Sequence, residues 1–234
     1  MQRYSAITEK NPREIVLLRG RGCRYRRCSF CDYHEDASCD EAANLAINTE
    51  ALKSVTGQYG TLEIVNSGSF CELEESTMKA IIGVCVAKGI RIVHFECHWL
   101  YRRHIPALRE AFARFGIEVK MKIGVETFDH QYREQTMLKG INETDPAKIA
   151  DAGFNECCLL FGLPGQTAES MRTDIETGLR HFERVCVNIM IENSAPLQPC
   201  DEVRQTFVRD IYPEYKENQR VDILLHNTDF GVGK

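Results

Sequence analysis

Residues 23–31 read C-R-Y-R-R-C-S-F-C, so three thiols (Cys23, Cys28 and Cys31) lie within nine residues just past an apolar segment. This run offers three metal ligands and no obvious fourth. A structural zinc site is normally closed by four side chains, and His34 would supply the fourth with the spacing Cys-x4-Cys-x2-Cys-x2-His. Zinc ligands usually come as two separated pairs, however. We therefore favour a [4Fe–4S] cluster, in which three thiolates leave one iron open to a ligand that is not protein.

The bulk composition is that of a globular protein, with 234 residues, 43% hydrophobic and 27% charged. This length fits a single domain spanning residues 1–234. No stretch is apolar for long enough to span a membrane, and the N-terminus lacks the apolar core of a signal peptide, so we expect a cytoplasmic protein without a membrane partner. Eleven cysteines, an odd number, favour reduced thiols over a disulfide framework.

The net charge of −5 argues against stable binding to nucleic acids, whose protein partners usually carry a basic surplus. Basic residues nevertheless gather between Arg19 and Arg27, around the first cysteines. Their charge either lowers the pKa of the thiols and balances a negative cluster, or belongs to a solvated basic loop. The other eight cysteines form no second ligand pattern, so we expect no auxiliary cluster and interpret most of them as small buried apolar residues.

Short β-branched segments alternate with segments of helical periodicity, which predicts βαβ units and a parallel sheet. The expected strands are Glu14–Leu18, Leu62–Val65, Ile90–Phe95, Glu118–Val125, Cys157–Phe161 and Cys186–Ile191. The expected helices are Asp40–Val55, Glu74–Ala87, Ile105–Phe115, Gln131–Met137, Pro146–Ala152 and Ala168–Val185. Six such units fit an α/β fold of the partial (βα)6 barrel type, a curved parallel sheet with outer helices. We expect its core at about residues 13–195, followed by a tail, 196–234.

Polar or small residues follow four of these strands, at the edge where parallel α/β sheets bind ligands. A small-residue turn follows the second strand at Ser67, Gly68 and Ser69, and backbone carbonyls there suit an ammonium group. Carboxylates end the third and fourth strands, at Glu96 and Glu126. The fifth strand runs into Gly-Leu-Pro-Gly-Gln-Thr, residues 162–167.

Together, the cysteine run, the Ser-Gly-Ser turn, the Glu126-Thr127 strand end and the Gly-Leu-Pro-Gly-Gln-Thr stretch resemble the radical S-adenosylmethionine (radical SAM) superfamily over roughly residues 13–195. Two features depart from the family pattern. Four residues rather than three separate Cys23 from Cys28, and Cys158 stands where related families often carry an aspartate. The resemblance implies a partial barrel that holds one [4Fe–4S] cluster and SAM. It also implies a 5′-deoxyadenosyl radical that takes a hydrogen atom from the substrate.

The resemblance assigns roles to individual residues. Cys23, Cys28 and Cys31 would hold the cluster, and no side chain beyond the bound cofactor would be catalytic. The turn at Ser67, Gly68 and Ser69 would receive the amino group of SAM, and Glu126 would contact its ribose. Glu96 would contact the methionyl end of SAM or the substrate. Leu163 would contact the adenine, and Phe30 would cover the cluster or stack on the adenine. The electron donor would be of the flavodoxin or ferredoxin type.

Residues 13–19 and 66–70 and the Cys31-Asp-Tyr-His stretch resemble a branch of the superfamily acting in 7-deazaguanine metabolism, most closely its compact queuine lyases. This resemblance implies a small-molecule substrate, queuine or a related 7-deazapurine. Cleavage of its C–N bond would release 7-aminomethyl-7-deazaguanine (preQ1) for queuosine salvage. Acidic side chains suit the donors of a guanine-like edge and a diol, so we expect Asp36, Glu192 and Asp229 to bind the substrate.

The stretch from Asn227 to Phe230 would then fold over the barrel mouth, and deleting the residues after His226 would abolish turnover. Three alternatives stay open. The first is a radical SAM enzyme that modifies 7-deazaguanine or another base in tRNA. The second, from a different class, is an RNA-binding zinc module of the Cys3His type. The third is an activase that installs a glycyl radical on a partner protein.

Overall fold

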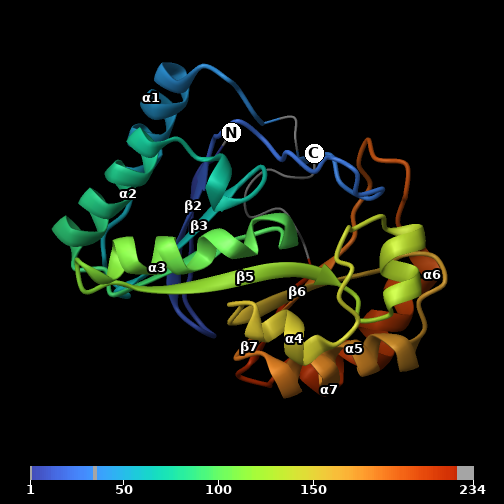
Figure 1. Cartoon of the computed structure of the whole chain (residues 1–234). Coiled ribbons are helices and arrows are strands. Elements are labelled where there is room, and N and C mark those ends of the chain that lie inside the picture. The colour runs from blue at the N-terminus through green and yellow to red at the C-terminus, as the bar shows by residue number, and fades with distance from the viewer. Residues whose placement is uncertain (1, 34–35, 226–234) are drawn as a thin grey trace. The chain divides into compact units, whose positions relative to one another are not determined.

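The computed structural model describes residues 2–33 and 36–225, which fall into two compact units. Unit 1 comprises Met1–Tyr25 and Tyr33–Lys122, and unit 2 comprises Arg26–Asp32 and Ile123–Lys234. Figure 1 labels most of the helices and strands of both units. The unit boundary falls within the cysteine run, so Cys23 belongs to unit 1 while Cys28 and Cys31 belong to unit 2.

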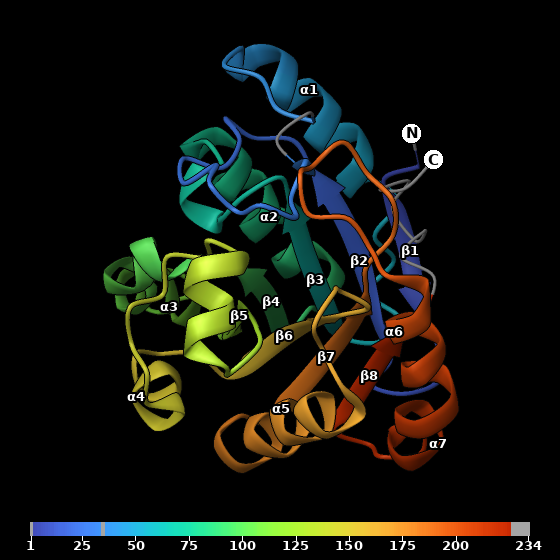
Figure 2. The same cartoon turned by 90° about the vertical axis from the view of Figure 1, so that its right-hand side faces the viewer.

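Unit 1 is built on a mostly parallel sheet whose strand order follows the chain. Its strands are β1 (Tyr4–Ile7), β2 (Arg13–Leu18), β3 (Thr61–Asn66), β4 (Ile92–Glu96) and the first part of β5 (Glu118–Glu126). Strand β1 pairs antiparallel with β2, and the later neighbours pair in parallel. Figure 2 shows β2, β3 and β4 side by side. Parallel pairing places the ends of these strands, where the predicted ligand-binding residues lie, at one edge.

The helices of unit 1 connect these strands and pack on one face of the sheet. They are α1 (Glu41–Leu52), α2 (Glu75–Lys88), α3 (Ile105–Ala113) and the short 3-10 segments η2 (Phe70–Glu72) and η3 (Trp99–His104). Helices α1 and α2 lie next to each other in Figures 1 and 2. Helix α2 ends at Gly89, whose left-handed φ of 68° closes the helix.

The two faces of this sheet differ because side chains alternate along each strand. On one face Val16, Ile64, Phe95 and Met121 stand in register across β2 to β5, and all four are buried. Phe95 packs edge-on against Phe112 of α3, with ring centroids 5.4 Å apart. This face is the apolar core of unit 1.

The opposite face of the same strands buries charge. Glu63 of β3 accepts a hydrogen bond from Arg13 Nε at 2.5 Å and also pairs with Lys122 Nζ. Lys122 reaches on to Glu96, 3.9 Å away at the end of β4. Arg13, Glu63 and Lys122 are each at most 4% exposed, whereas the side chain of Glu96 is 34% exposed. We call these four residues the ionic ladder.

Unit 2 contains three further parallel strands with helices around them. It holds the end of β5, the π-helical segment η4 (Tyr132–Thr136), α4 (Pro146–Asp151), β6 (Glu156–Phe161), α5 (Ala168–His181), β7 (Arg184–Ile189), α6 (Asp201–Thr206), the π-helical segment η5 (Phe207–Ile211), α7 (Tyr212–Tyr215) and β8 (Val221–Leu224). Strand β7 pairs with both β6 and β8. Phe161 packs on Phe207 at a centroid distance of 5.8 Å, which ties β6 to η5.

All six predicted strands are present, and β1 and β8 join them. Helix α5 starts as predicted, with Thr167 Oγ1 accepting from the Ser170 amide at its N-terminus. The prediction that this helix continues to Val185 was wrong. It ends at His181, because Phe182 turns extended and β7 begins at Arg184. Among the described residues, no helix is both long and apolar enough to cross a membrane.

Candidate functional site

In unit 1 the first cysteine lies against the small-residue turn that follows β3. The Cys23 amide donates to the Ser67 carbonyl at 2.8 Å. A Cβ on Gly68 would stand 3.0 Å from the Cys23 nitrogen and would collide with the carboxylate of Glu72. A side chain at position 68 would therefore displace the carboxylate of Glu72, and glycine leaves room for it. The structure brings together the predicted cluster ligand and the turn predicted to receive an amino group.

The same turn is fixed on its other side by residues that follow β4. Ser69 Oγ accepts from the His98 amide at 2.8 Å, and the Asn66 side-chain amide donates to the Ser69 carbonyl at 3.1 Å. His98 Nδ1 in turn accepts from the Leu100 amide, and its ring stacks on Tyr25 with centroids 4.5 Å apart. The turn is thus held by contacts from two neighbouring strand ends before any ligand binds, which favours a fixed binding geometry.

In unit 2 the other two cysteines lie on an apolar wall. Its members are Phe30, Met137, Leu160, Leu163 and Met190, all at most 9% exposed, and Cys28 and Cys31 pack against it. The cysteine segment is anchored by Ser29, whose amide donates to the Met137 carbonyl at 3.0 Å and whose hydroxyl donates to the Thr136 carbonyl at 2.6 Å. The predicted residues Phe30 and Leu163 therefore share one wall with two predicted cluster ligands.

A buried ion pair accompanies these thiols. Lys139 Nζ lies 2.7 Å from Glu126 Oε1 and 5.4 Å from the centroid of the Phe30 ring. Burial lowers the pKa of Lys139, but the charges of Glu126, Cys28 and Cys31 together raise it above its ordinary value. Lys139 therefore stays cationic beside the two thiols. A fixed cation in an apolar setting stabilises thiolates, the form in which cysteine binds iron.

Glu126 itself adopts an unusual backbone conformation, with a φ of 69° at the end of β5. This left-handed region is costly for a residue other than glycine, and such strain gathers at functional sites. Its carboxylate pairs with Lys139, which the sequence did not foretell. Contact of Glu126 with the ribose of SAM stays a prediction.

The turn after Glu126 is hydrogen-bonded to Asp174, a buried acid of α5. Asp174 Oδ1 accepts from the Phe128 amide at 2.7 Å, and Asp174 is 5% exposed. Burial raises the pKa of Asp174 to about 6, against the lowering effect of its hydrogen bonds with Phe128 and Thr127. The native protein therefore binds a proton between about pH 4 and 6 that the unfolded chain has released.

We expect the free energy of unfolding to fall as the pH rises from about 4 to 6, by on the order of 3 kcal/mol from Asp174 alone. Asp174→Asn should flatten this slope while still accepting the Phe128 hydrogen bond. Urea unfolding of the parent protein and of D174N at several pH values measures how the free energy of unfolding depends on pH. Asp151→Asn, at an exposed aspartate of α4, is the matched control and should keep the parent slope. A D174N slope equal to that of the parent would contradict the expectation.

The predicted cluster ligands are three thiols, the side chains that hold iron–sulfur clusters. Among the described residues, no three Cys, His, Asp or Glu side chains stand close enough together to hold one ion. His34, which would complete the alternative zinc site, lies outside the described residues.

The three predicted substrate residues are not gathered within one unit. Asp36 of unit 1 takes hydrogen bonds from Arg3 on both oxygens, at 2.9 and 3.0 Å. Glu192 of unit 2 is exposed in the segment after β7. Asp229, together with the predicted cover from Asn227 to Phe230, lies outside the described residues. Their contact with the substrate stays a prediction.

Two residues at the site were missed in the sequence analysis. Glu72 bonds the cysteine loop to the turn after β3, and its spacing Ser69-x-x-Glu72 is that of a capping box, a signal that was available. Lys139 follows η4 in an irregular segment, and no local pattern marks it. Its partners Glu126 and Phe30 lie 13 and 109 residues before it in the chain.

Burial also distinguishes the remaining cysteines from the three of the loop. Cys85, Cys97, Cys157, Cys158 and Cys186 are buried, Cys71 and Cys200 are partly buried, and Cys39 is exposed. Burial raises the pKa of Cys71 to about 11 and that of Cys85 to about 12, and it also raises the pKa of Cys97 and Cys157.

Comparison with known proteins identifies a similar enzyme among solved structures. No protein-family model matches the chain, and no curated protein sequence matches it significantly. Among solved structures, a queuine lyase from Clostridium spiroforme bound to SAM and queuine is 42% identical, with a TM-score of 0.92 and 100% of both chains covered. This match confirms the partial (βα)6 barrel predicted from the sequence.

More distant solved structures share the fold alone. Streptococcus suis SuiB bound to S-adenosylmethionine matches at 12% identity and a TM-score of 0.54, covering 90% of this chain and 49% of that one. SuiB bound to its precursor peptide SuiA matches at 11% identity and a TM-score of 0.56, covering 90% and 48%.

Proposed function

Because this chain belongs to the queuine lyase family of radical SAM enzymes, we propose that it cleaves the C–N bond joining the cyclopentenediol of queuine to its aminomethyl group. The product would be preQ1, which queuosine salvage returns to tRNA. The observation that carries this proposal is 42% identity over the full length of an enzyme described as bound to SAM and queuine. A small-molecule substrate also agrees with the net charge of −5.

The enzyme uses a [4Fe–4S] cluster and SAM, which together supply a carbon-centred radical able to remove a hydrogen atom from the substrate. Cys23, Cys28 and Cys31 would hold the cluster. Lys139 would offset the negative charge of the thiolates from its fixed position at Glu126.

The remaining residues of the site would bind and shield the cofactor. In unit 2, the wall that contains Phe30 and Leu163 would exclude water from the reacting centre. In unit 1, the turn at Ser67, Gly68 and Ser69 would present backbone carbonyls to the ammonium of SAM. The exposed end of the ionic ladder, Glu96, would meet the methionyl end or the substrate.

Substrate recognition would use acidic groups against the N–H donors of the deazaguanine edge and the hydroxyls of the diol. Asp36, Glu192 and Asp229 are the proposed residues. The chain would work as a single domain, with the tail after residue 196 covering the substrate. The electron would come from a flavodoxin- or ferredoxin-type carrier. The cytoplasm is the proposed location, because such chemistry needs reducing conditions.

The decisive experiment is anaerobic reconstitution with iron and sulfide, reduction with dithionite, and incubation with SAM and free queuine. We expect 5′-deoxyadenosine and preQ1 to appear together by mass spectrometry. Formation of 5′-deoxyadenosine while queuine survives would overturn the substrate and leave the cofactor chemistry standing. Queuosine-containing tRNA serves as the comparison substrate and should remain uncleaved.

A further inference from the structure

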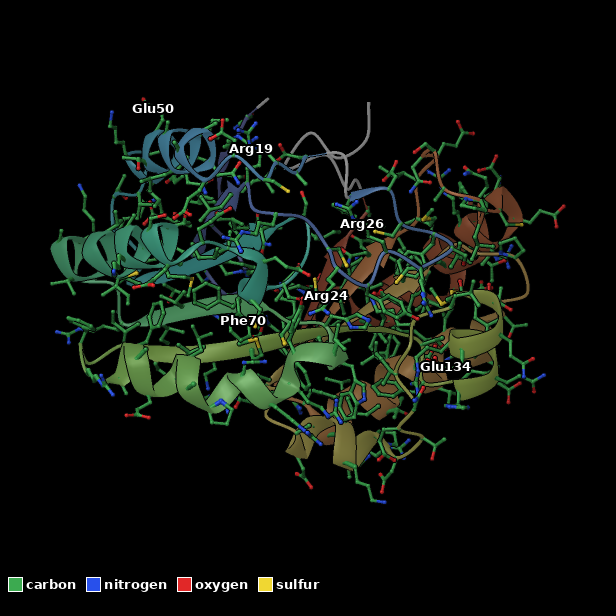
Figure 3. The ribbon with its side chains drawn as sticks, turned by 45° about the horizontal axis from the view of Figure 1, so that its top comes forward. Arg19, Arg24, Arg26, Glu50, Phe70 and Glu134 are labelled. Atoms are coloured by element: carbon green, nitrogen blue, oxygen red, sulfur yellow. The ribbon has the colours of Figure 1, made fainter. Side chains whose placement is uncertain are left out.

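We propose that Glu72 is a positioning residue that locks the loop carrying Cys23 to the turn that receives the amino group of SAM. This inference rests on the proposed function for the identity of the ligand. Its structural basis lies entirely in unit 1, within residues 20–25 and 66–72 and the following η3 segment. Figure 3 labels Arg24 and Phe70 in the two segments that Glu72 joins.

The carboxylate of Glu72 uses both of its oxygens for this purpose. Oε1 accepts from the backbone amide of Arg24 at 2.6 Å, and Oε2 accepts from the backbone amide of Ser69 at 2.5 Å. The residue is 5% exposed. Hydrogen bonds of a buried carboxylate to amides are charge-assisted and roughly twice as strong as neutral ones. One side chain therefore fixes the residue next to Cys23 and the last residue of the turn.

The backbone carbonyl of Glu72 also binds the cysteine loop. The Glu72 carbonyl accepts from the Arg21 amide at 3.0 Å, on the other side of Cys23. A Cβ on Gly20 would stand 2.5 Å from that carbonyl oxygen. The backbone of the cysteine loop therefore lies too close to the backbone of Glu72 for a side chain at position 20. The cysteine loop is thus held to Glu72 on both sides of its first ligand.

A third group, Tyr101 of η3, completes the surroundings of the carboxylate. The pKa of Tyr101 is raised to about 12, first by burial and then by the charge of Glu72 and a hydrogen bond to it. The phenol therefore stays protonated and donates to the carboxylate. Three donors from three separate segments converge on Glu72, an arrangement that a side chain acting only as a helix cap does not need.

Glutamine cannot replace this carboxylate, because its amide group has one acceptor oxygen and its nitrogen would face an N–H donor. In Glu72→Gln the loop and the turn lose their common anchor while the fold keeps its core. We expect the affinity of the reconstituted protein for SAM to fall by about tenfold. We also expect SAM to change the EPR spectrum of the reduced cluster less than in the parent. Amide hydrogen exchange at Arg24 and Ser69 should speed up even without the cluster.

Glu14→Gln is the matched control, since Glu14 is also buried and its two oxygens accept from the backbone amides of Thr56 and Gly57, outside the cysteine loop and the turn. It should leave SAM affinity and the EPR response unchanged. A decrease in affinity of less than threefold in E72Q, or an equal decrease in E14Q, would overturn the proposal.

If E72Q fails to fold, Tyr101→Phe decides the question, because it removes one donor to Glu72 and keeps the ring. We expect it to weaken SAM binding by about threefold, and a change below twofold would overturn the proposal. None of these measurements requires queuine. If SAM affinity depends on Glu72 but the enzyme leaves queuine intact, the proposed function would be overturned and the role of Glu72 would stand.

Discussion

We expect that replacing Cys28 with serine abolishes cluster assembly and SAM cleavage. Cys28 is one of three thiols in the loop, and it packs on the apolar wall near the Lys139 cation. Serine offers a hydroxyl that is hardly ionised at neutral pH, so if Cys28 holds the cluster as proposed, one iron would lose its anionic soft ligand. We expect the iron content after anaerobic reconstitution to fall well below the parent value of about four per chain. Formation of 5′-deoxyadenosine should drop below detection.

Cys39→Ser provides the matched control, because Cys39 is the exposed cysteine close to the loop in sequence. It should reconstitute with the iron content and the absorption spectrum of the parent. Full iron loading and SAM cleavage in Cys28→Ser would show that the loop does not hold the cluster as we describe.

The second large effect concerns stability and the ionic ladder. Glu63→Gln leaves Arg13 and Lys122 buried without the carboxylate that both contact. Removing one partner of a buried ion pair typically costs about 3–5 kcal/mol, because the remaining charge is desolvated without compensation. We expect a loss of this order in the free energy of unfolding at pH 7, measured by urea denaturation. Glu96, 3.9 Å from Lys122, offsets a part of it.

Glu50→Gln is the comparison, since Glu50 pairs with Lys53 on the surface of α1 with side chains 74% and 67% exposed. Figure 3 shows Glu50 pointing outward from that helix. Exposed pairs contribute about 0–1 kcal/mol, so E50Q should scarcely change stability. A loss below about 1 kcal/mol in E63Q would mean that the buried charges find other compensation.

Features encoded by local sequence patterns were predictable. The strands β2 to β7 appear in the sequence as short apolar runs, and Gly89 and Thr167 mark helix ends by their backbone preference and capping chemistry. The strand-end location of Cys23 and of the Ser67–Ser69 turn followed from the parallel sheet alone. These features depend on neighbours within a few residues.

Features that depend on contacts between residues far apart in the sequence were not predictable. Glu72 bonds to Arg24 across 48 residues, and Lys139 finds Glu126 across 13, so no local pattern reveals either pair. Strand β1 has only four residues and becomes a strand by pairing with β2. The end of α5 was missed because the apolar spacing of Phe182 and Val185 continues the helical pattern, while pairing of β7 with β6 pulls this segment into the sheet.

The burial of most cysteines outside the loop has a consequence for how the cofactor is built. Sulfurs that burial keeps protonated, such as Cys85 and Cys157, are poor ligands for incoming metal ions. Iron delivered to the folded chain therefore meets few rival sites. Burial would in this way help a protein with eleven cysteines to direct its iron to the three proposed ligands.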